Sequence, residues 1–306
     1  MSVYFYMICK LLLARRKMLL FKSSYYSLFL LQSVADFYIF VFVEIIMRPR
    51  KLNYFNLFSE NMKSYAVFSM ANLIFSRGIL CSGHIVIALN RLTAFYLPLR
   101  QERIWSSWTI CLSVISLWML CIVVSTPVII SHHNDAHFFL TQCGVLYMSG
   151  GPLGEYNSYQ GAVVSVVTVA VCSACYTCSY RKTKQRKYAM VEQRLLLCAI
   201  ASAVPFCIEM VRSILVLLSA KLKNDLFKTM TSLWFYEMGA IVSSSVWLQL
   251  IINKNVRDLI LNRTSANQGS RTHSDVILRK MITNQSNVAP ATRRISTVSV
   301  PVREKL

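Results

Sequence analysis

The chain has 306 residues and a formal net charge of +20; 55% of its residues are hydrophobic and 15% are charged. Charged residues make up about a quarter of an ordinary soluble domain, so this composition indicates an integral membrane protein. It excludes secreted disulfide scaffolds, acidic disordered chains and collagen-like fibres. In a membrane protein the excess of Lys and Arg reports orientation in the bilayer, so no nucleic-acid partner is predicted.

The first segment, residues 1–13, is apolar apart from Lys10. A helix of this length reaches about 20 Å, which is less than the roughly 30 Å of a bilayer core. Arg15, Arg16 and Lys17 follow the segment, whereas a cleavable signal peptide carries its positive residues before its apolar stretch. We therefore expect residues 1–13 to be the partial, inner end of a first membrane helix that is short or truncated.

Six further segments are long and apolar enough to cross a membrane, and they lie near residues 25–47, 66–89, 106–131, 159–180, 194–219 and 229–252. Their isolated polar residues recur at helical intervals rather than alternating as in a barrel strand. The predicted fold class is therefore all-α, an integral membrane helical bundle.

Two different segments follow the last span. Residues 253–262 alternate apolar and charged positions, which predicts a short amphipathic helix on the membrane surface. Residues 263–306 are rich in Ser, Thr, Asn and Arg, which predicts a disordered tail. The transmembrane domain is thus expected to occupy residues 1–262.

The short loops carry unequal numbers of basic residues. Loops 10–24, 90–105 and 180–194 together hold 14 Lys and Arg, whereas loops 48–65, 132–158 and 220–228 on the opposite side hold 7. Because cytoplasmic loops are enriched in Lys and Arg, this difference predicts a multi-pass plasma-membrane protein whose C-terminus is cytoplasmic.

Ionisable residues inside a span cost roughly 2.5–3.5 kcal/mol each on insertion scales, and five of them can be placed by depth: Asp36, Arg77, Glu209, Arg212 and Glu237. Their depths of about 10 to 17 Å from the outer ends of the helices place them in one layer. We expect Arg77, Glu209, Arg212 and Glu237 to bind a small ligand in a pocket open to the outside, and Asp36 to be a polar node inside the bundle.

A structural interpretation of the same charges stays open. Glu209 and Arg212 are three residues apart on one helix face, so they can pair without any ligand. Arg77 and Glu237 are a second candidate pair.

Arg91 lies at the predicted inner end of span 66–89 and is followed by aromatic residues and Pro98. An arginine in this position can cap neighbouring helices in one state and release them in another. The alternative is an ordinary interfacial arginine whose side chain extends toward the membrane surface.

Several short motifs resemble those of rhodopsin-like seven-helix receptors, specifically nematode serpentine chemoreceptors of the class gamma and class V type. The segment Asn90-Arg91-Leu92 resembles their version of the Asp-Arg-Tyr motif, and Asp36 ends a segment similar to the Leu-Ala-x-x-Asp motif of the second receptor helix. Pro205 matches the kink of the sixth helix. The resemblance covers about residues 20–260.

Three departures from the receptor pattern accompany this resemblance. Asn90 replaces the acidic residue that precedes Arg91, and no Asn-Pro-x-x-Tyr motif closes the last helix. Ala66 stands where many receptors carry the cysteine that bonds the second outer loop, so Cys143 lacks its expected partner.

The resemblance implies that the six complete spans are helices two to seven of a G-protein-coupled chemosensory receptor. It implies an odorant or pheromone-like small molecule as ligand. It also implies a heterotrimeric G protein as partner, contacted by Arg91, Arg181 and Lys182. A transporter or channel that uses the buried charges as an ion path is the alternative function.

Two further patterns are weaker. The loop containing His132, His133 and His137 offers metal-capable side chains, and Cys172, Cys175 and Cys178 are spaced by three. A single loop seldom fixes metal geometry, and cysteines in a membrane helix are usually packing residues, so neither a metal nor a cofactor is predicted. Nothing resembles a nucleotide-binding loop or a nucleophile elbow, so no enzymatic activity is predicted.

Overall fold

The computed structural model describes residues 2–261, with gaps at 54–57, 60, 132–133, 135–136, 141–145, 149–150, 186–189 and 223–225. The predicted disordered tail, residues 263–306, lies outside the described residues, and so does Cys143.

Long helices make up most of the described chain. The first part consists of α1 (Ser2–Lys17), a 3-10 turn (Leu19–Lys22), α2 (Ser24–Val41), a π-helical turn (Phe42–Met47), α3 (Arg48–Lys51), α4 (Lys63–Tyr96) and α5 (Gln101–Ile104). The second part consists of α6 (Ser107–Ile130), α7 (Gly151–Gln185), α8 (Met190–Leu222), α9 (Leu226–Ile252) and α10 (Lys254–Ile260). The predicted helical membrane bundle is confirmed.

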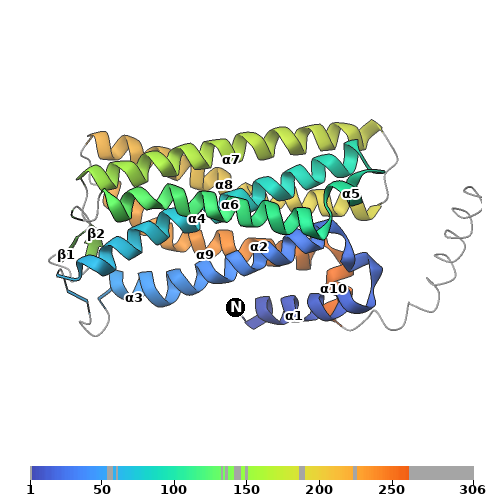
Figure 1. Cartoon of the computed structure of the whole chain (residues 1–306), viewed down its shortest axis with the longest axis horizontal. Helices are drawn as coiled ribbons and strands as arrows, with labels where there is room; N and C mark the ends of the chain where they lie inside the picture. The colour runs from blue at the N-terminus through green and yellow to red at the C-terminus, as the bar shows by residue number, and fades with distance from the viewer. Residues whose placement is uncertain are drawn as a thin grey trace, which may run out of the picture. The chain divides into compact units, whose positions relative to one another are not determined.

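A short hairpin is an element that the sequence pattern did not indicate. Strands β1 (Phe138–Leu140) and β2 (Leu146–Met148) pair antiparallel, with Phe139 opposite Tyr147. Figure 1 shows this hairpin at one end of the bundle, which we call the hairpin end, and α5 and α10 at the other, which we call the α10 end. The count of basic residues predicts that the hairpin end faces outward.

Five segments within the described residues have the length and hydropathy of a membrane span: Ser24–Lys51, Lys63–Tyr96, Ser107–Ile130, Pro152–Thr183 and Gln193–Leu218. The described apolar part of α9, Tyr236–Ile252, is shorter. Helix α1 has 16 residues, so it extends about 24 Å, less than the thickness of a bilayer core.

Local sequence signals set several helix ends. Helix α4 ends at Tyr96 because Pro98 disfavours helical backbone at the residue before it, and Leu97 is indeed non-helical with φ −129°. Helix α6 begins after Ser106, whose side chain accepts a hydrogen bond from the backbone N–H of Thr109 at 3.3 Å. Pro205 lies inside α8, where it removes one backbone hydrogen bond.

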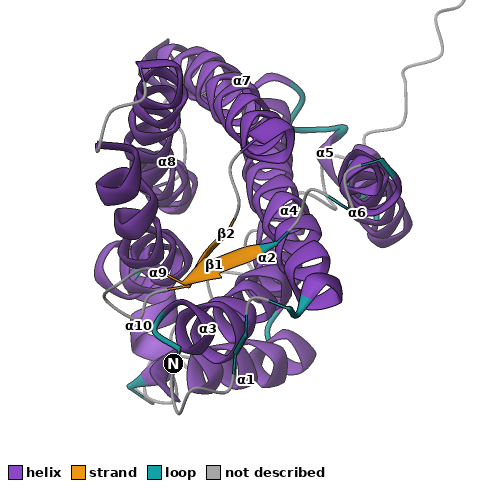
Figure 2. Cartoon of the chain, turned by 90° about the vertical axis from the view of Figure 1, so that its left-hand side faces the viewer, coloured by secondary structure: helices purple, strands orange, loops and turns teal. Residues whose placement is uncertain are grey.

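Helix α4 is the centre of the packing. It contacts α2, α6, α7 and α8, while α9 contacts α2 and α8. Figure 2, viewed from the hairpin end, shows α6 on the outer side of α4 and the hairpin lying across the bundle. Helix α6 exposes many large apolar side chains, including Ile115, Met119 and Val123, as expected of a lipid-facing helix. The interior face of α4 carries the polar residues described next.

Candidate functional site

Four charged side chains from α4, α8 and α9 form one connected group, which we call the charge cluster: Arg77, Glu209, Arg212 and Glu237. Arg212 lies between the two glutamates, with its Nη2 2.7 Å from Glu209 Oε1 and its Nε donating to Glu237 Oε2. The Nε atom of Arg77 is 3.6 Å from Glu209 Oε1. Four of the five residues predicted for this layer thus lie together, without Asp36, and Arg77 pairs with Glu209 rather than with Glu237.

Helix α7 completes the surroundings of Arg77. The Nη1 group donates to Gln160 Oε1 at 2.7 Å and to both the backbone and side-chain oxygens of Asn157 at 3.2 Å. A Cβ atom at Gly161 would lie 2.7 Å from the same Nη1, so glycine leaves room for the guanidinium beside the helix. The sequence interpretation missed Asn157, Gln160 and Gly161, although uncharged polar residues at the start of an apolar span were an available signal.

The charge cluster is electrically balanced and removed from water. Arg77, Glu209 and Arg212 are buried, and two positive charges face two negative ones. Removing an ion from water costs several kcal/mol, and the attraction between close opposite charges only about offsets this penalty. Each member of the cluster therefore needs its partners. One acceptor remains, because the buried Oε1 of Glu237 has no hydrogen-bond partner among the described residues.

Asp36 is a second buried polar residue, and it joins three helices. Its carboxylate accepts hydrogen bonds from the Tyr4 hydroxyl of α1 at 2.9 Å, from Gln32 Nε2 of α2 at 3.0 Å and from the Ser245 hydroxyl of α9 at 3.2 Å. These bonds fasten α1 to the bundle, since Tyr4 reaches Asp36 from a helix too short to span the membrane.

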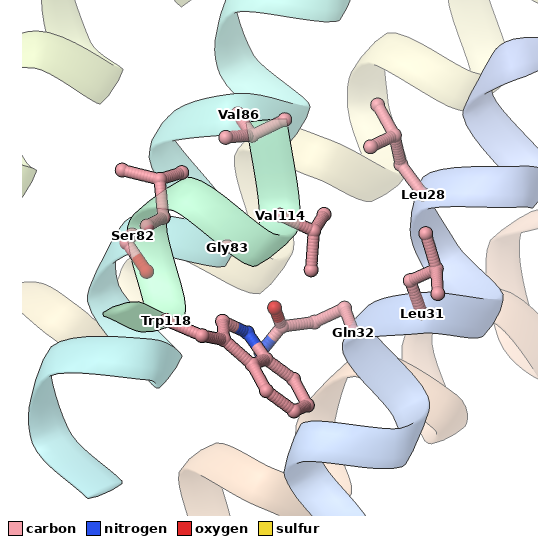
Figure 3. A pocket seen from close by; sticks show the side chains of 9 residues that line it. Leu28, Leu31, Gln32, Ser82, Gly83, Val86, Val114 and Trp118 are labelled. Carbon is pink, nitrogen blue, oxygen red and sulfur yellow. The ribbon is translucent and has the colours of Figure 1, made fainter. Parts of the chain in front are cut away.

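Gln32 also forms one wall of a small cavity of about 20 Å³ between α2, α4 and α6. Figure 3 shows its side chain extending from α2 toward Trp118 and Gly83. A Cβ atom at Gly83 would lie 1.5 Å from Gln32 Oε1, so this close approach of the amide to α4 requires glycine. The cavity is large enough for about one water molecule.

Arg91 lies near the α10 end and is 1% exposed, so its side chain does not extend to the membrane surface. Its Nη2 donates to Asn90 Oδ1 at 2.8 Å, and its guanidinium carbon lies 4.5 Å from the centre of the Tyr25 ring. The hydroxyl of Tyr25 accepts from Gln249 Nε2 on α9. Asn90 Nδ2 in turn donates to Ser24 Oγ at 2.9 Å, so the start of α2 holds the end of α4.

The other two residues predicted to contact a G protein lie differently. Arg181 is exposed near the end of α7, and Lys182 is half-buried with its Nζ 5.6 Å from the centre of the Tyr96 ring of α4. Arg91 is therefore an interior residue of the α10 end, while Arg181 and Lys182 belong to the surface.

A family model for the serpentine type 7TM GPCR chemoreceptor Srv matches residues 1–266, which includes every helix from α1 to α10. The chain belongs to this family. No curated protein matches the chain. Membership confirms the resemblance to nematode serpentine chemoreceptors that the motifs around Asp36 and Arg91 indicated, and it makes the chain a multi-pass membrane receptor of chemosensory GPCR type.

Two further sequence patterns concern the cysteines of α7 and a histidine-rich loop. Cys172 and Cys175 are buried and Cys178 is half-buried along α7. The described residues contain no group of three His, Cys, Asp or Glu side chains arranged to hold a metal. Most of the histidine-rich loop, residues 132–137, lies outside the described residues. The Srv family is a receptor family rather than an enzyme family.

Proposed function

We propose that this Srv receptor binds an external small molecule at the charge cluster and signals through a heterotrimeric G protein at the α10 end. The observation that carries the proposal is that α4 contributes an arginine to both regions. Arg77 and Arg91 are 14 residues apart, or about 21 Å along one continuous helix. A displacement of α4 at Arg77 therefore also moves Arg91.

The charge cluster suits a ligand site because it joins three helices, α4, α8 and α9, through ion pairs that can exchange partners. A polar ligand that donates to the unused Oε1 of Glu237 competes with Arg212 for that carboxylate. Such competition changes the pairing between α8 and α9, and a ligand shifts a conformational equilibrium only when it binds the two states unequally. Pro205 lies one turn from Glu209 and gives α8 a place to bend.

The α10 end suits the G-protein partner because it carries basic residues at its surface and a buried arginine in its interior. Arg181 and Lys182 offer positive charge for an acidic surface, and the predicted orientation places them in the cytoplasm. Arg91 becomes available only if Tyr25 and Asn90 release it, which makes it a candidate for a contact formed in the active state alone.

The experiment compares Arg91→Ala with Arg77→Ala in cells that display the receptor and are challenged with a panel of odorants. Arg91→Ala should abolish G-protein activation and leave odorant binding largely intact, whereas Arg77→Ala should weaken binding. Surface display is measured for each variant, because loss of a buried partner also destabilises the fold. Normal signalling by well-displayed Arg91→Ala would overturn the proposed coupling role.

A transporter or channel is the second candidate, and the buried charges of both signs favour it, since such residues also mark ion paths. Ion flux into proteoliposomes that contain the purified chain and no G protein would establish this alternative. We expect no flux above that of empty liposomes.

A further inference from the structure

A groove near the α10 end lies between α1, α2 and α6, separate from both the charge cluster and Arg91. Its volume is about 290 Å³. Its wall is mostly apolar and consists of Ile8, Leu12, Leu30, Leu31, Val34, Ile110 and Cys111, with three polar residues, Arg15, Ser27 and Ser107.

The polar and apolar residues occupy different parts of the groove. Arg15 is in the last turn of α1, Ser27 is in the first turn of α2 and Ser107 is the first residue of α6. From this polar end the wall continues along α1 to Ile8 and along α2 to Val34. Each stretch covers eight residues, a rise of about 10 Å along the helix.

Two features make the polar end attractive to an anion. No described carboxylate lies within 4 Å of the Arg15 guanidinium, so its charge is available. The N-terminus of the 24-residue helix α6 meets the groove at Ser107, and a helix N-terminus carries partial positive charge. Arginine and a helix N-terminus are both common ligands of phosphate groups.

The surroundings place this polar end at the level of the lipid headgroups. Trp108, the residue after Ser107, is 77% exposed, and tryptophan is enriched where the membrane meets water. The rest of the groove then lies at the depth of the hydrocarbon chains. The predicted orientation puts it in the cytoplasmic leaflet, which is rich in anionic lipids.

We propose that this groove binds an anionic phospholipid, with the phosphate at Arg15 and the start of α6 and one acyl chain along α1 and α2. Charge complementarity selects an anionic headgroup, and the apolar length selects an acylated ligand over a soluble phosphate ester. The bound lipid fills the space between α1 and its two neighbours, and so adds to the contact that Tyr4 makes with Asp36. This proposal is independent of the receptor's ligand and of its G protein.

The test uses the full-length chain in nanodiscs of phosphatidylcholine that contain a small fraction of phosphatidylserine with a photoreactive acyl chain. After irradiation, mass spectrometry should find the label on residues 27–34 and 107–111. Arg15→Ala should reduce this labelling about tenfold, because a charge-assisted bond to phosphate is lost. Arg16→Ala removes the same charge from an exposed neighbour that does not line the groove, and should reduce labelling less than twofold.

A second pair of variants tests the apolar part. Cys111→Trp fills the groove and should abolish labelling, whereas Leu112→Trp, at the exposed neighbour outside the groove, should leave it unchanged. Thermal unfolding midpoints confirm that each variant is folded, and Arg15→Gln replaces Arg15→Ala if the latter unfolds. Equal effects of the Arg15 and Arg16 substitutions would mean that diffuse surface charge, and not the groove, attracts the lipid.

Competition separates the lipid from a soluble phosphate. Unlabelled phosphatidylserine should displace the photoreactive lipid, while phosphatidylcholine and deacylated glycerophosphoserine should not. Displacement by glycerophosphoserine at the same concentration as the lipid would assign the site to soluble phosphate esters, and displacement by phosphatidylcholine would remove the headgroup selectivity. Either result overturns the proposal.

Discussion

The charge cluster and the site of Arg91 each contain a buried arginine of α4, but the two arginines have different partners. Arg77 belongs to a group with two carboxylates, and the carboxylate of Glu209 is the nearest acid to it. Arg91 has a neutral amide and a tyrosine ring beside it, from Asn90 and Tyr25. The described partners of Arg77 thus include a carboxylate, whereas those of Arg91 include a neutral amide and an aromatic ring.

This difference affects the free-energy cost of losing each of these contacts. Breaking a buried ion pair by removing one partner costs about 3–5 kcal/mol. A cation–π contact contributes about 0.5–2 kcal/mol, and a hydrogen bond to a charged group about 1.5–3 kcal/mol. The contacts of Arg91 with Tyr25 and Asn90 are therefore individually weaker than an ion pair of the charge cluster.

The largest expected effect comes from neutralising the central acid of the charge cluster. Glu209→Gln leaves Arg77 and Arg212 with one carboxylate between them, so we expect a loss of about 3–5 kcal/mol in stability, measured by thermal unfolding in detergent. Glu44→Gln is the matched control. Its ion pair with Arg48 at 2.7 Å is partly exposed, so the loss there should stay below about 1 kcal/mol.

A double substitution tests whether the loss is electrostatic. Glu209→Gln combined with Arg77→Gln restores the charge balance and should recover part of the stability that Glu209→Gln alone loses. Arg77→Gln is also measured alone. If the stability lost in the double variant equals the sum of the losses in the two single variants, the cluster is held by packing, and the contrast with Arg91 is wrong.

The next effect concerns the layer between the two regions, where Gln32 approaches α4. Gly83→Ala places a methyl group 1.5 Å from Gln32 Oε1, so the amide must move and its bond to Asp36 is strained or lost. We expect a destabilisation of about 1–3 kcal/mol by overpacking. The control is Gly239→Ala in α9, where a Cβ atom meets nothing within 4 Å. It should raise stability by about 0.5–1 kcal/mol, because alanine favours helix.

The sequence allowed a good prediction of the helices and of which charges would be buried together. Apolar length identifies the spans, and the cost of burying Arg77, Glu209, Arg212 and Glu237 requires that opposite charges meet. The particular pairs could not be predicted, because a choice such as Glu209 over Glu237 for Arg77 depends on helix rotation that no local pattern records. For the same reason the contact between Tyr25 and Arg91 could not be predicted, since nothing in the sequence distinguishes Tyr25 from other aromatic residues of a membrane helix.

A smaller effect should follow from loosening Arg91. Tyr25→Leu removes the ring beneath the guanidinium, worth about 0.5–2 kcal/mol, and should raise basal G-protein activation without odorant by roughly twofold to thirtyfold. Tyr25→Phe keeps the ring and loses only the hydrogen bond from Gln249, so its basal activity should rise less. Activation is measured as nucleotide exchange on a reconstituted G protein. Equal rises in the two variants would assign the effect to the Gln249 bond instead of the ring.

The smallest effect is expected at the surface of the α10 end, where Lys182 lies over the Tyr96 ring. Lys182→Ala removes one partly exposed charge, which contributes about 1 kcal/mol or less to stability, so the unfolding midpoint should hardly change. Its influence on G-protein binding should instead act through long-range attraction, because surface charges mainly raise the rate of association. We therefore expect a severalfold slower association at low salt that disappears as salt screens the charge, measured by surface plasmon resonance with the receptor in nanodiscs. Lys182→Arg keeps the charge and should behave as the unmodified receptor. Lys182→Ala could instead abolish coupling as completely as Arg91→Ala is expected to, and at every salt concentration. That result would show that Lys182 makes a specific contact and that burial does not distinguish the role of Arg91 from that of Lys182.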